Sequence, residues 1–344
     1  PAMHAQPDEI EALARVVARH GGIYATHMRS EGGALLEAIA EAIQVARATG
    51  VRLQISHLKT AGEANWPKLD AAFAAIEAAQ AEGLAVASDR YPYTASCTDL
   101  DVILPTWAAQ GGRAAILARL RNPADRARIR AEMAAARSDR YWDNVWIGST
   151  RHPANAPYTG QPIARAAAAW NLHPLDAALR FMETDELFTG GIFFGMSEAN
   201  MWRILAKPWV MIGSDASLRA PTGPLSHDHP HPRAYGTFGR FLRAAVDGRT
   251  VPLGEAIRKM TSLPAAHFRL ADRGILRPGA FADVVVFDPA TIQDRATFEQ
   301  PHQFCAGIHA VWVNGAFSLR DGQPLVRAGR YLTPSGNQEN SQGH

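Results

Sequence analysis

Ile23-Tyr24-Ala25-Thr26-His27 and Val51-Arg52-Leu53-Gln54-Ile55-Ser56-His57 decide the fold, together with Trp209-Val210-Met211-Ile212-Gly213-Ser214-Asp215. Each stretch is a short apolar run that ends in a histidine or an aspartate. Helical patterns separate the runs, and Gly50 and Gly83 end two of the helices. The alternation of strand and helix predicts an α/β fold with a parallel sheet. Reactive residues at the ends of successive strands are typical of a (β/α)8 TIM-type barrel.

The predicted barrel occupies residues 1–273. Helical patterns rich in Arg and Ala fill residues 107–195, and we expect them to be further barrel elements with inserted helices. Short β-branched runs broken by Gly, Pro and Asn-Gly follow over residues 274–332 and predict a small β domain, a sandwich of strands and hairpins. Residues 333–344 are polar and rich in Gly, Ser, Asn and Gln, which predicts a flexible tail.

Composition excludes several classes of partner. The chain has 344 residues, of which 47% are hydrophobic, so it can bury a large core. Its formal net charge of +2 provides no basic field for nucleic acid or for an anionic membrane, and no apolar run is long enough to span a bilayer. Its two cysteines, Cys97 and Cys305, lie far apart without metal-type spacing, which indicates neither a disulfide framework nor a thiolate zinc site. We therefore expect a cytoplasmic protein.

His27, His57 and Asp215 are the candidate metal ligands. In a parallel barrel the strand ends open at one mouth, and imidazoles with a carboxylate are ligands that Zn²⁺ selects. Each histidine alone could be a hydrogen-bonded core imidazole, and Asp215 alone could cap a helix. Their occurrence at three strand ends favours the metal site, because buried ionisable groups are costly without partners. Zinc lowers the pKa of bound water to about 7, so this pattern predicts a metal-dependent hydrolase.

Five motifs occur in the order found in the N-acyl-D-amino-acid deacylases (D-aminoacylases) of the amidohydrolase superfamily. They are GGIYATHMRSE at 21–31, ISHLK at 55–59, DRYPY at 89–93, MIGSD at 211–215 and HPHPRAYGTF at 229–238. The chain resembles this family over nearly its whole length, and residues 107–195 are the least specific part. The resemblance implies zinc-dependent hydrolysis of the amide bond of an N-acyl-D-amino acid, which gives a carboxylate and a free D-amino acid.

The resemblance also implies a metal site. His27 and His57 match two histidines that hold one tightly bound zinc together with a cysteine from earlier in the chain, and a second, weak metal site is an alternative. Asp215 matches the general acid/base of the reaction, beside its candidacy as a ligand. The family's first strand also carries a His-x-His pair, and neither this pair nor the cysteine is present. We expect both in an upstream segment of the same protein that completes the barrel and the metal site.

Lys59, Tyr91 and Arg233 match substrate-binding residues of the family, and their chemistry suits a carboxylate. The alternatives are a surface lysine, a packed tyrosine and a solvated loop arginine. The preferred substrate side chain stays open, because two sets of residues could form its pocket. These are the arginines Arg90, Arg151 and Arg219 and the aromatic residues Trp107, Phe193 and Phe194.

Two other functions stay open at this point. One is a cyclic-amide hydrolase of the hydantoinase or dihydroorotase kind, against which Arg233 in its His-Pro-Arg setting argues. The other is a non-catalytic scaffold, which would be expected to have lost its metal ligands, whereas His27 and His57 are intact. The sequence predicts no oligomeric state.

Overall fold

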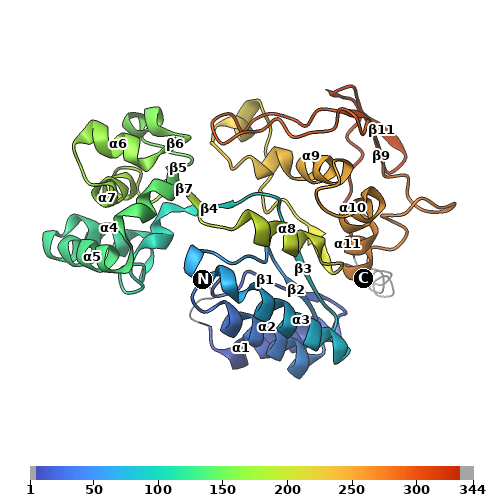
Figure 1. Cartoon of the computed structure of the whole chain (residues 1–344), viewed down its shortest axis with the longest axis horizontal. Coiled ribbons are helices and arrows are strands. Elements are labelled where there is room, and N and C mark those ends of the chain that lie inside the picture. The colour runs from blue at the N-terminus through green and yellow to red at the C-terminus, as the bar shows by residue number, and fades with distance from the viewer. Residues whose placement is uncertain (1–4, 334–344) are drawn as a thin grey trace, which may run out of the picture.

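The computed structural model describes residues 5–333, which contain three sheets of four strands each and helices on either side of them in the chain (Figure 1). The helices are α1 Pro7–Arg19, α2 Leu35–Thr49, α3 Leu69–Ala81, α4 Gly112–Arg121, α5 Pro123–Ala136, α6 Ile163–Trp170, α7 Pro174–Thr184, α8 Glu198–Ala206, α9 Arg233–Val246, α10 Leu253–Met260 and α11 Ser262–His267. The strands are β1 Ile23–Thr26, β2 Arg52–Ile55, β3 Val86–Arg90, β4 Ala95–Asp99, β5 Val145–Ile147, β6 Gln161–Pro162, β7 Gly190–Phe194, β8 Val210–Ile212, β9 Val284–Phe287, β10 Ile308–Val313, β11 Ala316–Arg320 and β12 Gln323–Pro324.

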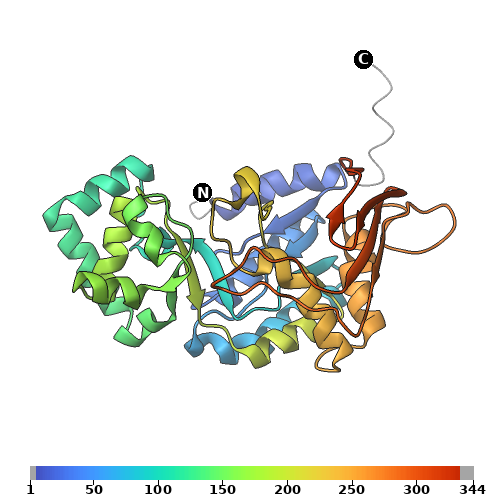
Figure 2. The same ribbon diagram turned by 90° about the horizontal axis from the view of Figure 1, so that it is seen from above.

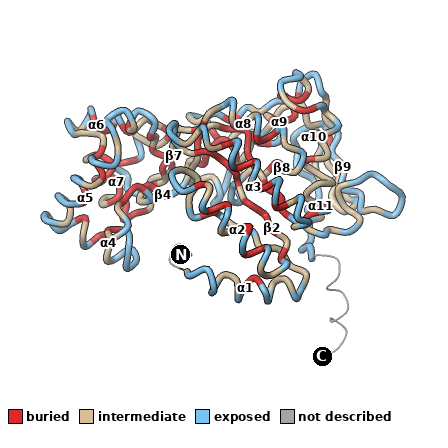
Figure 3. The backbone as a smooth tube through the Cα atoms, turned by 60° about the horizontal axis from the view of Figure 1, so that its bottom comes forward, coloured by how far each residue is buried: buried red, intermediate tan, exposed pale blue. Residues whose placement is uncertain are grey.

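The first sheet is parallel and has the strand order β1-β2-β3-β8. Leu53 and Ile55 in β2 are completely buried and share a core with residues of α1, α2 and α3. Buried residues follow these strands and inner helix faces in Figure 3, whereas the outer helix faces are exposed. Gly50 ends α2 with φ +70°, a left-handed conformation that glycine adopts without steric cost. The predicted alternation of strand and helix is confirmed here.

Residues 95–194 form a separate unit that differs from the expected barrel elements. The strands β4, β7, β5 and β6 make an antiparallel sheet in that order, and α4–α7 pack with it around a core of their own (Figure 2). The helical content matches the expectation, but no strand of this unit joins the parallel sheet among the described residues. The pairing is the cause: Ala95 in β4 lies opposite Phe194 in β7, so the chain leaves the parallel sheet and returns at nearly the same point.

The third sheet is antiparallel and contains β9–β12, in the part of the chain where strands and hairpins were predicted. Asn314 and Gly315 form the turn between β10 and β11, with φ +50° and +81°, and Val313 pairs with Ala316. Positive φ at both central residues is the geometry that Asn-Gly favours in two-residue hairpins. Beyond residue 333, the predicted tail lies outside the described residues. Among the helices described, none combines the length and apolar character needed to cross a membrane.

Candidate active site

His27 and His57 meet at the carboxyl edge of the parallel sheet. His27 follows β1 directly and His57 follows β2 after one residue, and the two strands pair in register with Thr26 opposite Ile55. The Nδ1 atom of His27 lies 2.5 Å from the Nε2 atom of His57. The structure therefore brings together the two histidines that the sequence analysis paired.

Asp89, in β3, fixes the backbone that carries His57. One of its carboxylate oxygens accepts the His57 N–H at 2.8 Å, and the other accepts from the buried Gln54 amide at 2.6 Å. His57 has φ +41°, which is unfavourable for a residue with a side chain and has to be held by its surroundings. Asp89 thus locks the turn after β2 from the neighbouring strand.

Glu31 lies on the other side of the His57 ring. Its Oε1 atom is 2.6 Å from His57 Nδ1 and forms an ion pair with Lys59, whose Nζ lies 2.8 Å from the same ring nitrogen. Burial alone would raise the pKa of Glu31, but the hydrogen bond with His57 and the charge of Lys59 lower it to about 2. A carboxylate on the Nδ1 atom leaves the Nε2 atom of His57 to a metal, the arrangement by which carboxylates orient metal-bound histidines.

The donor atoms suit a metal ion. His27, Glu31 and His57 form a group whose possible ligand atoms lie within 4.8 Å of one another. Because the Oε1 atom of Glu31 already contacts His57 and Lys59, the two imidazoles are the candidate ligands in this group. Burial and the neighbouring His57 lower the pKa of His27, so its imidazole is neutral near pH 7, the form that binds metal.

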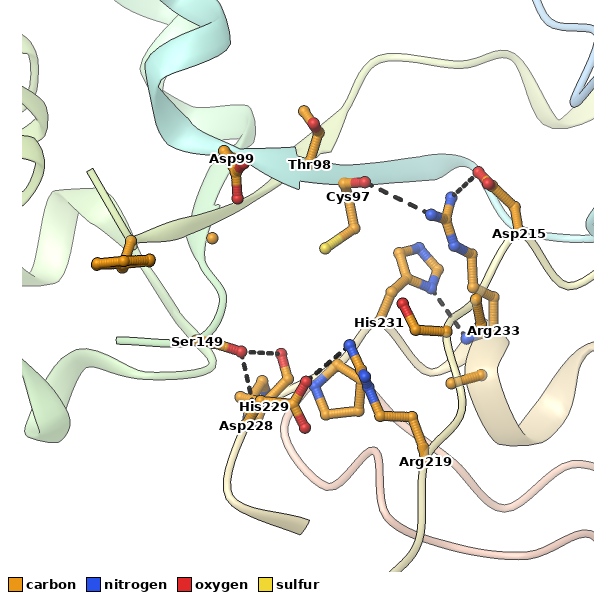
Figure 4. Close-up of a pocket in the computed structure, with 16 residues that line it drawn as sticks. Cys97, Thr98, Asp99, Ser149, Asp215, Arg219, Asp228, His229, His231 and Arg233 are labelled. Atoms are coloured by element: carbon orange, nitrogen blue, oxygen red, sulfur yellow. Dashed lines mark hydrogen bonds and ion pairs between the residues drawn. The ribbon is translucent and has the colours of Figure 1, made fainter. Parts of the chain in front are cut away.

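Asp215 and Arg233 form a second pair of site residues. Asp215 follows β8, and Arg233 begins α9; Arg233 Nη1 lies 2.9 Å from Asp215 Oδ2 (Figure 4). The Arg233 guanidinium also stacks on the ring of Tyr91, 4.5 Å from its centroid. Asp215 is not in the group formed by the two histidines and Glu31, so its role as a metal ligand stays a prediction.

His231 fixes the start of α9. Its Nδ1 accepts the backbone N–H of Arg233 at 2.9 Å, and its Nε2 lies 3.0 Å from the carbonyl oxygen of Ala95. Burial, followed by the charge of Arg233, lowers the pKa of His231 well below its ordinary value. The ring is therefore neutral, and it holds the arginine in place without adding charge. His231 lies in the motif at 229–238, but the sequence analysis assigned it no role.

A cavity of about 750 Å³ joins these groups. Lining residues from the segments that follow the parallel strands and from α9 include His27, Glu31, Lys59, Tyr91, Asp215 and Arg233. The antiparallel unit and its connections add an apolar and aromatic wall, made of Val102, Ile103, Tyr141, Phe193, Phe194 and Met196. All three predicted substrate-binding residues therefore line one cavity with one of the two histidines.

A smaller cavity of about 280 Å³ lies on the other side of Asp215 and Arg233, and Figure 4 shows it. Cys97 and Thr98 in β4 belong to the walls of both cavities. The arginines considered for a side-chain pocket do not gather. Arg219 lines the small cavity, Arg151 stacks on Phe188 at 3.2 Å, and Arg90 is buried behind Tyr91.

Glu31 is the site residue that the sequence analysis left without a role. It lies in the first motif, four residues after His27, in a segment without regular structure. A helical spacing would have placed both side chains on one face, but a loop gives no such rule. Only the approach of Lys59 and His57 from the next strand shows what Glu31 does.

A parallel sheet covered by helices, with imidazoles and a carboxylate at its carboxyl edge, is typical of TIM-type barrels that hold a metal at their strand ends. Residues 3–318 match the model of the amidohydrolase family. The chain belongs to this family, and the fold class expected from the sequence is confirmed.

Several relatives carry specific names. The chain is 38% identical to an N-acyl-D-glutamate deacylase of Alcaligenes xylosoxydans xylosoxydans over 95% of its own length and 58% of that protein. It is 39% identical to a D-aminoacylase of the same organism over 92% of its own length and 55% of that protein. The chain thus spans under three fifths of these curated relatives.

Solved structures of proteins with the same names have a similar fold. A zinc- and phosphonate-bound N-acyl-D-glutamate deacylase from Bordetella bronchiseptica superimposes with a TM-score of 0.75 at 34% identity, covering 94% of this chain and 59% of that one. A D-aminoacylase crystal structure gives a TM-score of 0.75 at 36% identity, covering 97% of this chain and 60% of that one.

Proposed function

We propose that the full-length protein hydrolyses the amide bond of N-acyl-D-amino acids in a zinc-dependent reaction, releasing a carboxylate and a free D-amino acid. The observation that carries this proposal is the cavity of about 750 Å³ that His27, Glu31, Asp215 and Arg233 line together. The names of the relatives, N-acyl-D-glutamate deacylase and D-aminoacylase, support the same substrate class.

Zinc, when held by His27, His57 and ligands from the upstream segment, would supply hydroxide at neutral pH and polarise the acyl carbonyl. Asp215 accepts the proton of the attacking water and returns it to the departing nitrogen. Its ion pair with Arg233 fixes the direction of the carboxylate. Glu31 and Asp89 do not contact the metal themselves; Glu31 holds the ring of His57 and Asp89 holds its backbone.

Arg233, Lys59 and Tyr91 bind the α-carboxylate of the substrate. A guanidinium can meet both oxygens of a carboxylate in one plane. Among the described residues, the Nη2 atom of Arg233 makes one long hydrogen bond, of 3.5 Å, to the carbonyl oxygen of Cys97. Holding the carboxylate at one end of the cavity fixes which enantiomer presents its amide to the metal site. A small molecule in the cytoplasm is the partner that we predict, with no nucleic acid or membrane.

The test compares full-length protein on N-acetyl-D-amino acids, their L-enantiomers, hydantoins and dihydroorotate. We expect zinc-dependent hydrolysis of the D-enantiomers alone. Asp215→Asn should lower kcat about 10²- to 10⁴-fold, the usual contribution of a general acid/base. Faster turnover of the cyclic amides would instead support a hydantoinase-like function. An Asp215→Asn variant with unchanged kcat, or zinc-free purified protein, would refute the proposed mechanism.

A further inference from the structure

Tyr91 lies at the centre of three positive charges. Its ring centroid is 4.3 Å from the guanidinium carbon of Arg90, 4.5 Å from that of Arg233 and 5.9 Å from Lys59 Nζ. All four side chains are buried, and Tyr91 forms part of the wall of the large cavity. A tyrosine ring attracts cations at its face, so each contact favours this position of the ring.

Two of the three cations have a carboxylate partner. Lys59 pairs with Glu31, and Arg233 pairs with Asp215. Arg90 has no ion pair with any described residue: its Nη2 donates to the Tyr93 carbonyl oxygen at 2.9 Å and contacts the Met196 sulfur at 3.0 Å. Its Nε and Nη1 atoms are buried without a hydrogen-bond partner among the residues described. Among the residues that the structure describes, one of the three positive charges around Tyr91 therefore has no carboxylate in direct contact.

Such a charge is costly in a folded protein. A buried guanidinium stays protonated, and burial without a partner is expensive unless a counter-charge arrives. Arg90 does not line the cavity, but Tyr91 does. An anion that binds beside Tyr91, Lys59 and Arg233 would supply the missing negative charge without touching Arg90.

Arg90 also holds the shape of this wall. It is the last residue of β3, and its bond to the Tyr93 carbonyl closes the Tyr91-Pro92-Tyr93 turn while its guanidinium covers one face of Tyr91. Arg233 stacks on the same ring. Loss of Arg90 would free the ring whose position sets the cavity wall.

We propose that Arg90 is a positioning residue that acts through Tyr91, holding its ring and supplying the surplus positive charge that selects a carboxylate-bearing ligand. This inference rests on the proposed function, because the carboxylate that it concerns is the α-carboxylate of the proposed substrate.

The test separates ligand choice from catalysis by using ligands that are not hydrolysed. Calorimetry measures the binding of N-methanesulfonyl-D-methionine and of its carboxamide to zinc-loaded full-length protein. We expect the wild type to prefer the acid. Arg90→Met should reduce that preference roughly 10- to 100-fold, as removal of one nearby unit charge would. Arg90→Lys keeps the positive charge but lacks the planar guanidinium group, so it should retain part of the preference.

Arg240→Met is the matched control. Arg240 stacks on Tyr93 at 4.7 Å, but it has its own carboxylate partner, Asp294, at 3.4 Å. It should leave the acid-to-amide ratio unchanged. If Arg90→Met weakens both ligands equally, or leaves both unchanged, Arg90 has only a structural role and the inference fails. Wild-type protein that prefers the acid but hydrolyses no N-acyl-D-amino acid would refute the proposed function and leave the role of Arg90 intact.

Discussion

Glu31 shows how one carboxylate can serve two functional residues, since a single oxygen contacts both the ring of His57 and the ammonium of Lys59. Glu31→Gln keeps the size of the side chain and removes its charge. We expect zinc affinity to fall about 10- to 100-fold, as for other residues that orient metal-bound histidines. Competition with a chelator measures this. Glu37→Gln, on the exposed face of α2, is the control. Equal zinc affinity in both variants would contradict the role assigned to Glu31.

Substitution of Arg233 tests the proposal that the cavity binds the carboxylate of an amino acid. Arg233→Ala and Arg233→Lys should each lower kcat/KM on an N-acetyl-D-amino acid roughly 30- to several-thousand-fold, or about 2 to 5 kcal/mol, because a charge-assisted pair in a buried site is lost. Lysine should be a poor substitute, since it lacks the planar fork.

Kinetics on the amide-capped substrate provide the comparison for both Arg233 variants. Their activity on this neutral substrate should fall much less, and their zinc content should stay unchanged. Wild-type kcat/KM on the acid in both variants would mean that Arg233 does not bind the carboxylate.

At the scale of single residues, the sequence predicted that His27 and His57 would meet, but it predicted neither the contact of Glu31 with His57 nor the pairing of Asp215 with Arg233. The positions of His27 and His57 after strands determined their meeting, because strand ends in a parallel sheet share one edge. The pairing of Asp215 with Arg233 joins the end of β8 to the start of α9, and the loop between them has no pattern from which that contact could be derived.

Among the elements, β3 supports the candidate metal site through the side chain of Asp89, which bonds to the end of β2 and to the turn after it. Asp89→Ala leaves the His57 N–H and the Gln54 amide unsatisfied, and each lost bond of this kind costs about 1 to 3 kcal/mol. We expect the melting temperature to drop by several degrees and zinc affinity to fall. Asp70→Ala, on the exposed part of α3, should change neither by a comparable amount. Retention of wild-type zinc affinity by Asp89→Ala would show that the turn is stable without this clamp.

The strands and helices of the parallel sheet were predictable because their signals are local. The pattern predicted a helix over residues 68–82, and α3 spans Leu69–Ala81. The antiparallel unit was not predictable in the same way. The strand β5 has only three residues, and β4 (Ala-Ser-Cys-Thr-Asp) contains few β-branched residues. The partner of β4 is β7, which lies far along the chain, so tertiary contacts determine this sheet.

For the whole molecule, buried neutral histidines make stability depend on pH. Burial, with the charge of Arg52, lowers the pKa of His267 to about 4. Between this value and the unfolded value of about 6.5, the unfolded chain binds the proton and the folded chain does not. The stabilisation is complete above about pH 6.5 and is lost as the pH falls towards 4, by up to about 3 kcal/mol.

His267→Leu should therefore flatten the pH dependence of unfolding in this window. Urea unfolding of full-length protein at several pH values between 7 and 4.5 measures the effect, and His20→Leu at an exposed position is the control. Identical slopes for wild type and His267→Leu would show that the imidazole titrates normally in the folded state.

The pairing of Ala95 with Phe194 has a consequence for how proteins with this scaffold diversify. A segment whose two ends lie side by side can be shortened, lengthened or exchanged without moving the scaffold that carries it. The segment between these residues has its own core and supplies one wall of the large cavity, whereas both histidines belong to the scaffold. Recombination at this junction would exchange one wall of the large cavity as a unit and leave the two histidines in place.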